Sequence, residues 1–177
     1  YGIILKLNPE PLPALTPAMV ARDAAYWDAL EKDLAADPLF KRDDFAQKCY
    51  AKLRSAIGGV YAYRRMNREA AAAFAQAIRL CPDSPDANYR LAQLLIEQRD
   101  YDEATALLAR YYRLDRYNTK AQEALEQVRK MRDTARAILD LEKQVAAQPN
   151  NIPAAIQLAR AYAQAQRFEA FDALVDR

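Results

Sequence analysis

The sequence contains no histidine, which removes the commonest general base and the commonest side-chain ligand of transition metals. Only three of its 177 residues are glycine, and none belongs to a glycine-rich loop of the kind that cradles phosphate groups. We therefore expect no catalytic residue, no metal site and no cofactor in this chain, and we do not expect the chain itself to be an enzyme.

Cysteine is also scarce. Cys49 and Cys81 lie far apart, and neither belongs to a CxxC pair. Two thiols could pair if the fold brought them together, but buried free cysteines are the favoured interpretation. The cysteines therefore do not determine the redox compartment.

Long apolar runs are missing, so no segment has the length needed to cross a membrane, and no signal peptide is visible. Tyr1 is not a methionine, and the sequence stops at Arg177 within a helical pattern. We expect the chain to be a fragment of a longer protein, with any membrane association made through that parent chain.

What the sequence does contain favours helices. It is 52% hydrophobic and 28% charged, enough to bury a core, and it is rich in Ala, Leu, Gln, Arg and Glu. The net charge is only +2 and no segment is strongly basic, so we expect no nucleic-acid partner.

The N-terminal part divides into an arm and a helical extension. Residues 1–16 combine a short apolar run with PEPLPALTP, whose prolines favour an extended polyproline conformation. Thr16 and Pro17 form a helix-start pair, and apolar residues then recur at helical spacing, which predicts a helix over about 17–36 within an extension spanning 17–50. We expect Trp27 to dock this helix onto the first pair of helices C-terminal to the extension.

From about residue 51 the sequence repeats itself. The pairs that match at an offset of 34 residues are Ile57-Gly58 with Leu91-Ala92, Tyr61 with Leu95, Asn67 with Tyr101, Ala70 with Ala104, and Phe74 with Leu108. A further copy around Leu158-Ala159, Tyr162 and Phe168 comes 67 residues after the second. A period of about 34 residues indicates stacked helical hairpins.

These residues resemble the tetratricopeptide repeat, a helix–turn–helix unit with the pattern W-x2-L-G-x2-Y…A-x3-F…P. The segments that carry the resemblance are IGGVY with AAAAF, RLAQLL with DYDEATALL, and QLARAY with RFEAFDALV. The resemblance implies an all-α fold, a right-handed superhelical array of hairpins over 51–177. Its units would be 51–84, 85–118, a degenerate 119–151 and a partial 152–177.

The sequence also departs from the family pattern. Arg54, Asn88 and Ala155 replace the usual tryptophan, and Arg65, Arg99 and Gln166 replace the turn glycine. Residues 119–148 contain no helix breaker, and an apolar stripe that includes Met131, Ala135 and Ile138 runs through them. This segment is either one long helix or a pair broken near residues 132–134, with one continuous or bent helix narrowly favoured.

One acidic stretch, QRDYDEA, has two interpretations. Asp100, Asp102 and Glu103 could form a metal or acid–base site, or they could cap a helix and complement its dipole. The matching segments RMNREA and QRFEA lack the full set of acids. We favour the helix start, because it needs no additional pocket.

The resemblance implies a non-catalytic protein–protein interaction scaffold whose partner lies on the inner face, formed by the first helix of each pair. The residues expected there are Lys52, Ser55, Tyr63, Tyr89, Arg90, Gln93, Glu97, Gln157, Arg160 and Gln164. Their mixed polar, charged and aromatic character suits an extended peptide or a neighbouring helix. The clamp by which some family members hold an acidic C-terminal peptide is disfavoured, since only Asn88 supplies an asparagine.

The first thirty residues carry a second resemblance. They are similar to the stretch that comes after the last membrane span in a family of bacterial multi-spanning proteins, which resemble glycosyltransferases using polyprenyl-linked sugars and often carry tetratricopeptide repeats. This implies, as an alternative, that the chain is the soluble accessory domain of such an enzyme and faces the periplasm. Otherwise a cytoplasmic location is expected.

Overall fold

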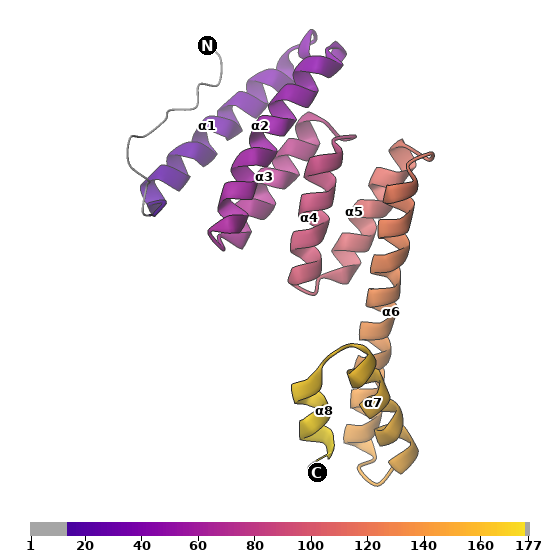
Figure 1. Ribbon diagram of the computed structural model, residues 1–177. Helices are drawn as coiled ribbons and strands as arrows, with labels where there is room; N and C mark the ends of the chain where they lie inside the picture. Colours follow the sequence, from indigo (N-terminus) through magenta and orange to yellow (C-terminus); the bar gives the residue numbers. More distant parts are fainter. Residues whose placement is uncertain (1–13, 176–177) are drawn as a thin grey trace.

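In the computed structural model, residues 14–175 are described, and this part of the chain contains eight α-helices, one short 3-10 helix and no strand (Figure 1). The elements in chain order are α1 (Pro17–Ala36), η1 (Phe40–Arg42), α2 (Asp44–Tyr63), α3 (Asn67–Leu80), α4 (Pro85–Glu97), α5 (Tyr101–Leu114), α6 (Thr119–Ala147), α7 (Ile152–Gln164) and α8 (Phe168–Val175). The all-α array of helical hairpins is therefore confirmed. Most of the expected N-terminal arm, residues 1–13, lies outside the described residues, and no described helix has the length and apolarity of a membrane span.

The helix α1 starts where the sequence predicts. The Thr16 side chain accepts a hydrogen bond from the amide of Met19, and Pro17 occupies the first turn, where its missing N–H costs nothing. Trp27 is only 3% exposed, and the Arg54 guanidinium of α2 lies over its ring at 5.2 Å. Trp27 thus docks α1 onto the first hairpin, as expected.

Three turns have the same unusual backbone conformation. Arg65, Arg99 and Gln166 have φ values of 59°, 62° and 55°, in the left-handed region where the family pattern places glycine. In each turn the next amide donates back to a carbonyl five residues earlier, at 2.9 Å from Met66 to Tyr61 and 2.8 Å from Asp100 to Leu95. The three turns lie 34 and 67 residues apart, the same offsets as those of the repeated sequence, and they share one helix ending.

Small residues let the two helices of the first hairpin approach closely. A Cβ atom placed on Gly58 of α2 would lie 2.7 Å from the Cε1 atom of Phe74 in α3. Phe74 is itself only 1% exposed, so the residues packed around it restrict the movement of its ring. The repeat pattern therefore reflects the steric fit between paired helices.

The helix α6 is continuous over 29 residues, so the degenerate third repeat is one helix and not a hairpin. Besides lacking a breaker, it carries Glu126 and Ile138 at the positions where the second repeat has Ala92 and Ala104. These larger side chains would oppose the close contact that a folded hairpin needs. The first half of α6 packs on α5, and α7 and α8 lie beside its second half (Figure 1).

Candidate partner-binding surface

Two successive first helices, α2 and α4, form a groove at the surface of the hairpin array. The cavity measures about 220 Å³, and its rim carries four of the residues that the sequence predicts for partner binding: Tyr63, Arg90, Gln93 and Glu97. Gly59, Ala62, Phe74 and Leu94 complete the lining. We call this feature the α2/α4 groove.

Arg90 is held in place at this groove by a polar network. Its Nε donates to Asp86 at 2.7 Å, and the Ser55 hydroxyl donates to the second oxygen of the same carboxylate. Burial acts to raise the pKa of Asp86, but the hydrogen bonds from Arg90 and Ser55 outweigh it and hold the pKa below its ordinary value. Asp86 therefore stays charged, and it fixes the guanidinium beside Gly59.

The other exposed residues of the groove are free to meet a partner. Tyr63, at the end of α2, is 86% exposed, so its ring is accessible to a partner. Gln93 donates to Glu97 at 3.0 Å one turn along α4, and both side chains remain exposed. Lys52 is also exposed, on α2.

Ser55 and Tyr89 do not reach the surface that the sequence assigns to them. Ser55 is 0% exposed, and its hydroxyl donates a hydrogen bond to the Asp86 carboxylate. The Tyr89 ring packs edge-on against Tyr111 of α5 with centroids 5.6 Å apart, and its hydroxyl oxygen is buried. Both residues contact a neighbouring helix, so the Ser55 side chain and the Tyr89 hydroxyl are not available to a partner, and Tyr89 is half-buried.

The three predicted residues of α7 do not join this groove. Gln157, Arg160 and Gln164 are exposed, but α7 packs on α6 and α8 and not on α5. The continuous helix α6 carries them away from α2 and α4 (Figure 1). Gln164 instead lines a different cavity, beside the middle of α6.

The acids of QRDYDEA mark a helix start. The Asp100 side chain accepts from the amide of Glu103 at 3.2 Å and caps α5. Asp102 forms an exposed ion pair with Arg136 of α6 at 2.6 Å. The helix-start interpretation is therefore confirmed.

The two cysteines are free, with Cys81 buried and Cys49 half-buried. Burial, reinforced by a hydrogen bond to Asp83, raises the pKa of the Cys81 thiol to about 12. A thiol in that state is protonated at neutral pH and is a poor nucleophile. Cys81 is thus a core residue.

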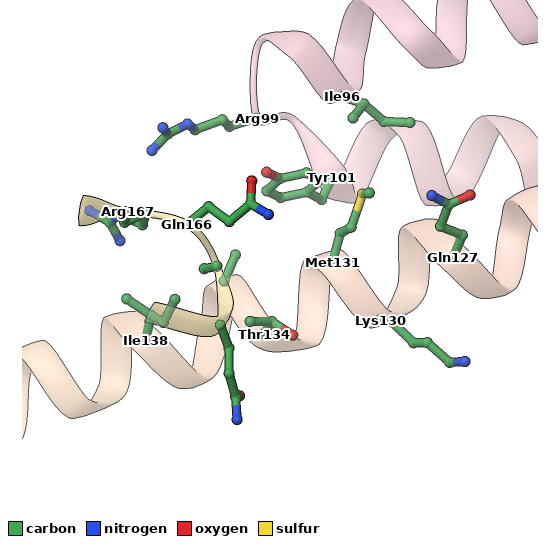
Figure 2. Close-up of a pocket in the computed structure, with 13 residues that line it drawn as sticks. Ile96, Arg99, Tyr101, Gln127, Lys130, Met131, Thr134, Ile138, Gln166 and Arg167 are labelled. Carbon is green, nitrogen blue, oxygen red and sulfur yellow. The ribbon is translucent and has the colours of Figure 1, made fainter. Parts of the chain in front are cut away.

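Sequence reasoning missed a larger cavity, of about 470 Å³, which we call the junction pocket. It is lined by the α4–α5 turn, the middle of α6 and the α7–α8 turn, with Tyr101, Met131 and Ile138 among its residues (Figure 2). The apolar stripe through Met131, Ala135 and Ile138 was the sequence feature that indicated an apolar surface at this place. The sequence could not show that two distant turns would meet over it.

Residues 65–128 match the family model of the tetratricopeptide repeat, in agreement with the repeats that the sequence shows over this segment. No curated protein sequence matches the chain significantly.

Two solved structures of MamA are similar to the chain. One, the crystal structure of MamA, has 18% identity and a TM-score of 0.40 and covers 92% of this chain and 95% of the other. A mutant of MamA has 15% identity, a TM-score of 0.39 and covers 88% and 95%. These TM-scores are too low to indicate a shared mode of binding.

Proposed function

We propose that the chain is a non-catalytic protein-interaction module and that it binds a peptide or helix of its partner in the α2/α4 groove. The observation that carries this proposal is the convergence of Tyr63, Arg90, Gln93 and Glu97 around one hollow, from two successive repeats. The tetratricopeptide repeat itself, a stack of hairpins with an extended surface, supports a scaffold role.

The chemistry of the groove suits a polar peptide that carries one aromatic or aliphatic side chain. Arg90 offers donors to a carboxylate or a backbone carbonyl, and Tyr63 offers an exposed ring. Because the helices on either side are packed and Arg90 is already held by Asp86, binding orders few side chains of this module. This lowers the entropic cost of recognition.

The test compares partner capture by the wild-type chain with capture by Tyr63→Ala and Arg90→Glu, with identification of the captured proteins by mass spectrometry. We expect both variants to lose the same captured proteins, by roughly tenfold or more if either residue is a hot spot. Circular dichroism should stay unchanged, because Tyr63 is exposed and the Arg90–Asp86 pair is a half-exposed one.

The matched control is Arg110→Glu, which reverses an exposed charge on α5 outside the groove. It should capture the wild-type set of proteins. Full retention of partners by Tyr63→Ala and Arg90→Glu would remove the groove from consideration. Loss on Arg160→Glu as well would extend the binding surface to α7.

A second candidate, the soluble accessory domain of a membrane-embedded glycosyltransferase that uses polyprenyl-linked sugars, is supported by the similarity of residues 1–30 to that family. On this proposal the parent gene encodes several long apolar spans upstream of Tyr1. A water-soluble domain encoded there would contradict it.

A further inference from the structure

We propose that the junction pocket is a second binding site, which takes an acidic peptide segment anchored by an apolar side chain. This inference rests on the chain being an interaction module, but it does not rest on the α2/α4 groove. The pocket volume of about 470 Å³ falls within the range of roughly 300–1,000 Å³ that is usual for ligand sites.

The pocket exists because α6 does not fold back on itself. A regular third repeat would place a turn near Asp133, one period after Arg99. Since α6 instead continues as one helix, the turn that contains Arg99 and the turn that contains Gln166 lie on the same side of its middle part and face each other there (Figure 1). The space between the two turns is the junction pocket.

Its floor is apolar and accessible. Met131 points from α6 toward Ile96 and the ring of Tyr101, and Ile138 lies further along the same helix (Figure 2). Ile96, Tyr101 and Met131 are half-buried, so an entering side chain would cover apolar surface that the chain leaves in contact with water. The polar tip of Gln166 reaches toward Tyr101 and can bond a peptide group (Figure 2).

The charge of the rim selects the ligand. Arg99, Lys130 and Arg167 line the pocket, and none of the described residues that line it carries a carboxylate. Arg99 and Arg167 lie at the same end, whereas Lys130 points outward from the rim (Figure 2). Glu142, outside the lining, accepts from Arg167 at 3.2 Å and orients it. A cationic rim around an apolar floor is complementary to carboxylates that flank an apolar residue.

The test uses the three methionines of the chain as probes. The protein is labelled with ¹³C at the methionine methyl groups and titrated with an acetylated, amidated peptide in which one Leu and one Phe are flanked by glutamates. We expect the Met131 signal to shift and saturate, while Met19 and Met66, which lie outside the pocket, stay in place. A peptide with lysines in place of the glutamates should leave all three signals unchanged.

Two variants sharpen the test. Arg99→Gln removes a rim charge without straining the turn, because Gln166 adopts the same backbone conformation in the equivalent turn. It should weaken peptide binding roughly tenfold, the usual effect of losing a hydrogen bond to a charged group. Arg110→Gln, which removes an exposed charge outside the pocket, should leave the affinity unchanged.

The proposal is overturned if Met131 does not shift, if the lysine peptide shifts it equally, or if Arg99→Gln binds as tightly as the wild type. The titration is repeated with Arg90→Glu, which alters only the α2/α4 groove. A Met131 shift that survives in this variant shows that the two sites are independent, whatever the outcome of the partner-capture experiment.

Discussion

At the scale of single residues, two glycines of α2 show how closely the helices of the first hairpin approach. Gly58 and Gly59 are adjacent on α2 and yet meet different surroundings. A side chain on Gly58 would collide with the buried ring of Phe74, whereas one on Gly59 would meet the Nη1 atom at the half-exposed end of the Arg90 side chain at 3.2 Å. The two positions therefore form a matched pair for testing how tightly the first hairpin is packed.

Gly58→Ala should destabilise the protein by about 1–2 kcal/mol, because overpacking outweighs the gain in helix propensity. Gly59→Ala should be neutral or stabilising by up to about 1 kcal/mol, since alanine favours the helix and the half-exposed Arg90 Nη1 needs only a small shift, which leaves its Nε bond to Asp86 in place. Urea unfolding followed by circular dichroism measures both free energies. Equal effects at the two positions would contradict the close contact between Gly58 and Phe74.

At the scale of elements, α1 is held on the first hairpin by its acidic side chains. These form hydrogen bonds and ion pairs with basic and amide side chains of α2 and α3. Arg54, buried in α2, donates from Nη1 to Asp23 at 2.7 Å and from Nε to Gln76 at 2.6 Å. Arg79 of α3 forms an ion pair with Glu31. The Arg79 hydrogen bond, opposed by burial, holds the pKa of Glu31 below its ordinary value of 4.5. This attachment therefore depends on pH.

A carboxylate whose pKa is lower in the folded state stabilises that state above its unfolded pKa. The contribution of Glu31 is thus present above about pH 4.5 and is lost as the pH falls through its lower folded value. Trp27, the only tryptophan, reports on α1 docking, so its emission should shift to the red on acidification below pH 4.5.

The control for this prediction is Glu31→Gln, which removes the charge that titrates. Its emission should already be displaced toward the red at neutral pH and should change less on acidification below pH 4.5 than that of the wild type. An identical pH profile in the two proteins would show that the ion pair with Arg79 does not hold α1.

At the scale of the whole molecule, α6 decides the shape. Its 29 residues span ~43 Å at about 1.5 Å per residue. The hairpins α2–α3 and α4–α5 precede it, and α7 and α8 pack beside its second half around Ile138, Leu158 and Tyr162 (Figure 1). The straight helix therefore separates two packed groups of helices and positions the turns of the junction pocket.

Asp133→Pro should break α6 at its middle, because proline removes a backbone hydrogen bond and clashes with the preceding turn at a cost of about 3 kcal/mol. We expect a loss of helical signal and a larger spread of particle dimensions in small-angle X-ray scattering. Asp133→Ala, which removes the same exposed charge, should leave both unchanged. Matching scattering curves for the two variants would show that α6 is not the rigid connector.

Much of the local structure could be predicted from the sequence. The start of α1 at Thr16 and Pro17, the three turns at Arg65, Arg99 and Gln166, and the capping role of Asp100 all depend on residues close in the chain. The binding surface was predictable only in part. Helical periodicity indicates which side of its helix a residue occupies, but it does not indicate how much of that side a neighbouring helix covers. Ser55 and Tyr89 were misplaced for this reason.

By itself the sequence determined the repeat, its period and the ends of the hairpin helices, because steric fit and backbone hydrogen bonding act over a few residues. The sequence favoured one helix over residues 119–148, and the structure shows it as the continuous helix α6; only the tertiary structure decided that α7 leaves the array and that the turns at Arg99 and Gln166 both line the junction pocket. These outcomes depend on how whole helix faces pack against one another. This packing depends on many contacts between residues that are distant in the chain, and a local sequence pattern carries no information about them.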